Sequence, residues 1–145
     1  MVEGLTFVVA VILNDHDELL LLRRSPQSQR DPNKWGLSGG RLESGEEPES
    51  GMIRELGEEL GIDVELRLEA RLGPLPAVGL KGGLVHLFHY TWVSGQLHLN
   101  HEHTGFQWVD QATYVDMDVM PGVEADLTYF GIWPGRTGSG RTGSA

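Results

Sequence analysis

The chain has 145 residues, a formal net charge of −10 at pH 7 and no cysteine. This length suits one domain with a hydrophobic core and is short for two. The lack of cysteine excludes disulfides and cysteine-ligated zinc or iron–sulfur sites, and it fits a reducing cytoplasm. The acidic balance argues against a nucleic acid polymer as partner, because a phosphate backbone requires a basic surface. A small phosphorylated substrate stays open, since a bound divalent cation can invert the local field.

The first part of the chain predicts two buried strands joined by a turn. Residues 5–13 (LTFVVAVIL) and 18–24 (ELLLLRR) are rich in β-branched residues or leucine, and NDHD separates them. The first apolar run is too short to span a bilayer and lacks a basic leader, so we expect no membrane partner and a cytoplasmic protein. Residues 25–34 are polar and predict a loop, followed by a short extended segment over 35–40.

A helix is predicted to begin at Pro48, because proline suits a first helical turn and the flanking glutamates favour the positive end of the helix dipole. A rotation of about 100° per residue separates two faces. The residues expected on the apolar face are Met52, Ile53, Leu56 and Leu60. Those expected on the opposite face are Arg54, Glu55, Glu58 and Glu59. Gly51 also falls on the acidic side, where the missing side chain would let another segment approach.

The remainder of the chain predicts further strands and a second helix. The expected strands cover residues 63–73, 83–93, 96–99 (QLHL) and 106–109 (FQWV), and the expected helix covers 121–132. Strands on either side of a strong helix indicate a mixed α/β layer protein. Residues 135–145 repeat GRTGS and offer nothing apolar to bury, so we predict one domain over 1–134 and a disordered tail.

The crowding of Glu55, Glu58 and Glu59 on one helix requires an explanation, because like charges at this spacing repel. Gly51 and Gly57 each cost about 1 kcal/mol of helix propensity relative to alanine. The helix is therefore not optimised for its own stability. A hard cation such as Mg²⁺ or Mn²⁺ would offset the repulsion. The competing interpretation is a solvated acidic surface, which is the usual meaning of a charge run.

Residues 40–62 fit a longer pattern: Gly, five residues, Glu, seven residues, Arg-Glu, apolar, any, Glu-Glu, any, Gly, apolar. Its fixed positions hold Gly40, Glu46, Arg54, Glu55, Glu58, Glu59 and Gly61. This pattern is the Nudix box, and the chain resembles the MutT-like Nudix hydrolases from its first strand to FQWV. Ser38 stands where the family often has proline, and Gly51 where alanine is frequent. Neither change removes a metal ligand, but the serine is expected to loosen the turn that presents Gly39.

The resemblance implies an α/β/α sandwich with a mixed β-sheet and a catalytic loop–helix–loop. It also implies hydrolysis of a nucleoside diphosphate linked to another group, with Mg²⁺ or Mn²⁺ as cofactor. The implied metal ligands are Glu55, Glu58, Glu59 and a backbone carbonyl at Gly39. Arg54 would orient a carboxylate, and Glu46 would brace the loop through Arg54. Gly40 and Gly61 would give the box its shape.

The stretch HLNHEHTGFQWV contains four further candidates, which are His98, His101, Glu102 and His103. The residues alone allow a zinc cluster, although histidines in a polar loop are more often solvated. In the family, a glutamate in this loop often reaches the metals or serves as the base. Glu102 matches that position, and His103 is a weaker candidate.

Basic residues near the second strand are candidates for contact with phosphates. Arg23 and Arg24 point in alternating directions, so at most one faces the cleft. We select Arg23 and Arg30 as substrate-binding residues, and the alternative is that they are ordinary surface cations.

The family resemblance leaves the substrate open. A small chain with a plain box most resembles enzymes that cleave a (deoxy)nucleoside triphosphate into a nucleoside monophosphate and pyrophosphate. Nucleotide-sugar and ADP-ribose hydrolases are the alternatives, and a homodimer is compatible with the sequence. A Nudix-fold binding module without turnover is an alternative of another class, but such modules typically lose box carboxylates and this chain keeps them all.

Overall fold

The computed structural model describes residues 5–133, and the predicted tail over 135–145 lies outside them. The strands are β1 (Thr6–Leu13), β2 (Leu19–Arg24), β3 (Trp35–Gly36), β4 (Ser38–Arg41), β5 (Val64–Pro76), β6 (Leu84–Gly95) and β7 (His103–Val109). The helices are α1 (Pro48–Leu60), α2 (Gln111–Tyr114) and α3 (Val123–Tyr129). The predicted strands at the N-terminus, the start of the first helix and the two long strands are confirmed.

The strands form one mixed sheet in the order β3-β2-β1-β6-β5, with β4 also pairing with β1 and β7 with β2. β1 runs parallel to β6 along its whole length, whereas its pairings with β2 and β4 are antiparallel. β2 pairs with β1 at Leu13 and Leu19, and β4 pairs with residues 7–10 on the same edge of β1. The sheet therefore brings β4, and the glycine pair within it, to the centre of the molecule.

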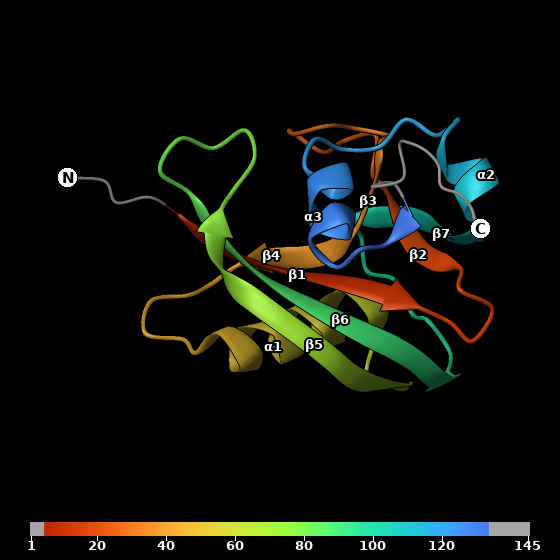
Figure 1. Cartoon of the computed structure of the whole chain (residues 1–145), viewed down its shortest axis with the longest axis horizontal. Coiled ribbons are helices and arrows are strands. Elements are labelled where there is room, and N and C mark those ends of the chain that lie inside the picture. Colours follow the sequence, from red (N-terminus) through yellow and green to blue (C-terminus); the bar gives the residue numbers. More distant parts are fainter. Residues whose placement is uncertain (1–4, 134–145) are drawn as a thin grey trace.

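Helices cover both faces of the sheet, with α1 on one side and α3 on the other (Figure 1). Val8, Ala10 and Ile12 of β1 belong to the core beneath α1, while Val11 belongs to the core beneath α3. Side chains alternate across a strand, so a central strand covered on both faces reads as a continuous apolar run. This arrangement explains the sequence LTFVVAVIL and gives an α/β/α layering.

The predicted faces of α1 are partly wrong. Ile53 is 61% exposed, while Glu55 and Glu59 are buried with only 9% and 4% of their surface exposed. Seen down the helix, Glu55 lies about 60° from Met52 and Glu59 about 20° from it, so both carboxylates fall in the stripe that faces the sheet. The assumption that charged side chains point to solvent misplaced them. Gly61 ends the helix with a positive φ of 92°, a conformation that suits glycine.

Residues 96–99 do not form the predicted strand. The N–H of His98 donates a hydrogen bond of 2.8 Å to the carbonyl of Leu60, and Leu97 and Leu99 pack against the core beneath α1. The segment therefore covers the end of α1 instead of pairing with another strand.

Several other boundaries differ from the prediction. β7 begins three residues earlier than expected, and β5 continues to Pro76 beside β6. The second predicted helix is shortened to α3, and α2, which the sequence analysis did not predict, precedes it with Asp110 accepting a hydrogen bond from the N–H of Thr113. Between residues 5 and 133, no helix is long and apolar enough to cross a membrane.

Candidate active site

Glu59 is fixed against β4 by two hydrogen bonds. Its Oε1 accepts from the Ser38 hydroxyl at 2.8 Å and from the N–H of Gly39 at 3.0 Å. Ser38 is buried in β4, so the residue expected to loosen this segment instead ties it to α1. Gly39 thus meets the box through its N–H, and the predicted metal contact of its carbonyl stays a prediction.

The glycine pair of β4 allows α1 to lie close to the sheet. A Cβ added at Gly40 would coincide with the carboxylate of Glu55, and one added at Gly39 would collide with the carbonyl oxygen of Val8. A side chain at Gly40 would displace the Glu55 carboxylate, and one at Gly39 would force the backbones of β4 and β1 apart. On α1 itself, a Cβ at Gly51 would collide with the side chain of Leu42, so the predicted close approach at Gly51 involves a side chain.

Arg54 links the loop before α1 to the carboxylates on the helix. Its guanidinium donates two hydrogen bonds to Glu46, from Nε to Oε2 at 2.7 Å and from Nη2 to Oε1 at 2.9 Å. Nη1 donates to Glu55 at 3.0 Å and to Glu58 at 3.3 Å. Nη2 also donates to the carbonyl of Arg41 at 3.2 Å. The guanidinium of Arg54 therefore orients three of the box glutamates.

The positive charge near the buried carboxylates of Glu55 and Glu59 is too small to offset the cost of burying them in ionised form. Burial raises the pKa of Glu59 to about 8, despite the hydrogen bonds from Ser38 and Gly39. Burial also raises the pKa of Glu55, although Arg54 acts in the opposite direction. The negative charge of Glu102 contributes to both shifts, which places this loop residue within electrostatic reach of the helix. Carboxylates held together at this depth are a donor set that fits a hard divalent cation.

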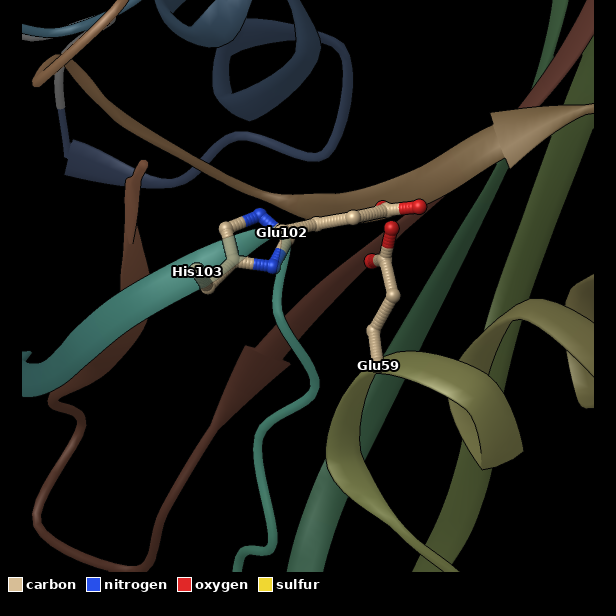
Figure 2. Close-up of side chains that lie close together, drawn as sticks. All are labelled: Glu59, Glu102 and His103. Atoms are coloured by element: carbon tan, nitrogen blue, oxygen red, sulfur yellow. The ribbon is translucent and has the colours of Figure 1, made fainter. Parts of the chain in front are cut away.

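Glu102 and His103 approach α1 from the other side of the site. Figure 2 shows the carboxylate of Glu102 directed towards that of Glu59, with the ring of His103 beside them. One ligand atom from each of these three residues lies within 4.8 Å of the others. Glu102 is exposed, whereas His103 begins β7 and is buried, which lowers the pKa of its imidazole to about 4. His98 and His101 do not belong to this group.

A cavity of about 220 Å³ is lined in part by Gly39 and Gly40, the glycines that lie against Glu59 and Glu55. Its walls include apolar side chains from β1, from the loop between β5 and β6, and from the segment before α3. The lining residues with polar side chains are Arg24, Arg30 and Asp126. Arg23 is exposed and is not among the lining residues, whereas its neighbour Arg24 is. The predicted contact of Arg23 with the substrate stays a prediction.

Asp126 is the lining residue that the sequence analysis missed. It lies on α3, and burial raises the pKa of its carboxyl to about 7. Its helical spacing from Val123 and Leu127, both buried, places it in the apolar stripe of α3. An acidic residue within an apolar helical stripe was the signal that could have identified it.

Comparison with known proteins agrees with this geometry. Residues 4–127 match the family profile described as NUDIX domain. The chain belongs to the Nudix hydrolase family. The CTP pyrophosphohydrolase of Escherichia coli is 34% identical over 106 residues, which cover 70% of this chain and 73% of that protein. The 8-oxo-dGTP diphosphatase of the same organism is 40% identical over 58 residues, 40% of this chain, and the match spans 44% of that protein's length.

Solved structures confirm the Nudix fold. The MutT protein from Methanosarcina mazei superposes with a TM-score of 0.62 at 27% identity, over 88% of this chain and 92% of that one. The predicted Nudix α/β/α sandwich with a mixed sheet is therefore confirmed. The Nudix box predicted from the sequence forms the loop before α1 and α1 itself.

Proposed function

We propose that this protein is a divalent-metal-dependent pyrophosphohydrolase that cleaves a (deoxy)nucleoside triphosphate into a nucleoside monophosphate and pyrophosphate. The observation that carries the proposal is that Gly39 and Gly40 line the cavity and also lie against the buried carboxylates of Glu59 and Glu55. A nucleotide in the cavity would bring its phosphates to the carboxylates. The CTP pyrophosphohydrolase and the 8-oxo-dGTP diphosphatase, by their names, act on nucleoside triphosphates, which supports this substrate class.

The side chains assigned to the cation are Glu55, Glu58, Glu59 and Glu102. Mg²⁺ or Mn²⁺ bound there would screen the diphosphate charge and acidify a water. Arg54 holds Glu55 and Glu58 in position, and Glu46 holds Arg54 through two hydrogen bonds. Glu102 is a candidate to accept the proton of the attacking water, because it reaches the cluster from an exposed loop.

Arg24 and Arg30 line the cavity, and we assign them to the phosphates and the apolar walls to the nucleobase. The carboxyl of Asp126, with its pKa near 7, can present either a donor or an acceptor to the polar edge of a base. Arg24 is held by hydrogen bonds to Ser28 and to the carbonyl of Arg30, so its guanidinium is positioned before a substrate arrives. These contacts favour a nucleotide with one base and a short phosphate chain.

A panel of nucleotides tests the proposal directly. Purified protein with Mg²⁺ or Mn²⁺ is offered nucleoside triphosphates, nucleotide sugars and ADP-ribose, and the products identify the bond that breaks. We expect a nucleoside triphosphate to give the highest kcat/KM, with release of pyrophosphate and complete loss of activity in EDTA. Preference for a nucleotide sugar or ADP-ribose would establish the alternative substrates. Tight nucleotide binding without any turnover would indicate a binding module, and full turnover in EDTA would exclude the metal mechanism.

The remaining assignments are a cytoplasmic location, no nucleic acid polymer as partner, and a monomer or homodimer. The assembly is measured by sedimentation at two protein concentrations. A species of twice the chain mass would establish the dimer.

A further inference from the structure

His103 is a buried imidazole with an unsatisfied ring nitrogen. Only 7% of the residue is exposed, and its Nδ1 has no hydrogen-bond partner in the described part of the chain. Buried polar atoms in folded proteins are normally paired, so an orphaned nitrogen beside a set of carboxylates calls for a ligand. The register of β2 and β7 places His103 opposite Arg24, and an arginine offers no acceptor that could satisfy a ring N–H.

The carboxylates beside His103 are directed towards the same point. Ligand atoms of His103, Glu59 and Glu102 all lie within 4.8 Å of one another, and Figure 2 shows the three side chains converging from α1 and from the start of β7. Ligands on opposite sides of one ion are about 4.2 Å apart for Mg²⁺ and about 5 Å apart for a larger ion. Small side-chain movements therefore suffice to bring these atoms into one coordination sphere.

We propose that His103 supplies a nitrogen ligand to a divalent cation held with Glu59 and Glu102, which biases this site towards transition-metal ions over Mg²⁺. Imidazole nitrogen suits transition metals, whereas Mg²⁺ prefers oxygen ligands. Along the first-row series, affinity for such a site rises from Mn²⁺ to Co²⁺. The inference rests on the divalent cation of the proposed function. It adds His103 as one ligand of that cation and a preference of the site for transition-metal ions.

The nature of the ligand is tested by electron spin echo spectroscopy of Mn²⁺ bound to the full chain. We expect modulation from a directly coordinated imidazole ¹⁴N in the wild type, replaced by the ¹⁵N pattern after labelling with ¹⁵N-histidine. His103→Gln removes the modulation. The matched control, His101→Gln, alters an exposed histidine of the same loop and retains it. Bound Mn²⁺ without nitrogen modulation in the wild type would overturn the inference, whether or not the variant folds.

Metal titration gives an independent measurement that needs no turnover. His103→Gln should weaken Co²⁺ binding tenfold or more, Mn²⁺ binding by less, and Mg²⁺ binding by under threefold, since loss of a ligand costs at least as much as loss of its supporting partner. Equal loss for all three ions would mean that His103 only shapes the site, which contradicts the inference. Nucleotide hydrolysis with Mg²⁺ is measured separately, so failure of this inference leaves the proposed function standing.

Discussion

At the scale of single residues, Arg54 contacts two carboxyl groups whose pKa values shift in opposite directions. Its hydrogen bonds lower the pKa of Glu46 to about 2, so the loop glutamate is firmly ionised. The same guanidinium contacts Glu55, yet burial outweighs it and the pKa of Glu55 is raised. Arg54 is therefore sufficient to fix the loop and insufficient to neutralise the helix carboxylates. The remaining repulsion is what a divalent cation would relieve.

Replacing Glu58 by Gln tests whether the exposed box carboxylate takes part in the chemistry. The change keeps the shape of the side chain but removes the charge that a hard cation requires. We expect kcat to fall on the order of a hundredfold or more, because the cation supplies most of the stabilisation of transition-state charge. The fold should survive, since Glu58 is exposed and accepts only a 3.3 Å hydrogen bond from Arg54.

Glu49→Gln is the matched control, because Glu49 lies on the same helix and, within residues 5–133, forms its one ion pair with Arg71, at 3.4 Å. It should retain near wild-type kcat. Similar high activity in both variants, each melting cooperatively, would show that the acidic face is only a solvated surface.

The raised pKa of Asp126 predicts a pH-dependent cost to stability. Burial moves this pKa from 3.8 to about 7, so the folded state binds the proton more tightly than the unfolded chain does. Stability from this group is complete below about pH 4 and is lost as the pH rises towards 7. Asp126→Asn removes the ionisable carboxyl and with it this loss of stability. The variant should be more stable than the wild type at pH 8 by up to about 4 kcal/mol.

Urea unfolding of both proteins at pH 5 and pH 8 measures this difference, which should widen at the higher pH. The control, Asp116→Asn, changes an exposed carboxylate and should show no such widening. A constant difference between wild type and Asp126→Asn across this range would mean that the surroundings of Asp126 do not raise the pKa of its carboxyl.

At the scale of elements, α1 has several features that lower its stability as a helix and that belong to the candidate site. It carries two internal glycines, has no side-chain cap at Glu47, and buries two glutamates against the sheet. The two glycines differ in the space around them. A Cβ at Gly51 would meet Leu42, whereas no atom of the described residues lies within 4 Å of a Cβ placed at Gly57. Gly57 therefore has no steric reason to remain glycine.

Gly57→Ala and Gly40→Ala should act in opposite directions. Alanine at Gly57 improves helix propensity and should raise stability by about 1 kcal/mol with activity retained. Alanine at Gly40 would meet the Glu55 carboxylate, so it should cost about 1–3 kcal/mol and lower kcat by displacing that side chain. Thermal melting and steady-state kinetics measure both effects. A fully active and stable Gly40→Ala protein would refute the close contact between β4 and α1.

At the scale of the whole molecule, the site joins the two layers that cover the sheet. The carboxylates come from α1 on one face, while the cavity is lined by Asp126 of α3 on the other. β4 carries the glycine pair between them, so both cores must be intact for the site to form. The described residues 5–133 contain both core clusters and every residue assigned to the site.

Removing residues 135–145 should therefore leave the melting temperature and kcat nearly unchanged. Removing residues 123–145 should abolish cooperative unfolding, because Val123, Leu127 and Ile132 leave the core beneath α3. Circular dichroism melting and hydrolysis assays on the two truncated chains provide the comparison. A large loss of activity in the shorter deletion would show that the terminal segment contributes to the site.

Features that depend on neighbours along the chain could be predicted from the amino-acid sequence. Apolar periodicity located β1, β2, β5 and β6, Pro48 marked the start of α1, and the fixed spacing of the Nudix box identified the family. These signals survive in sequence because each is set within one strand or one helix. The segment over 96–99 is not a strand: the N–H of His98 bonds to Leu60 at the end of α1 and that of Gln96 bonds to Asp63, and local pattern reveals neither contact.

Which side chains meet became clear from the three-dimensional structure. It buried Glu55 and Glu59 while exposing Ile53, placed Arg24 at the cavity, and brought Asp126 into its wall. In the fold, His103 also lies close to Glu59. These outcomes depend on how a helix is rotated against a sheet and on which strand edges pair. Rotation and pairing are set by packing between distant segments, and a one-residue shift in register reverses the side chains of a whole strand.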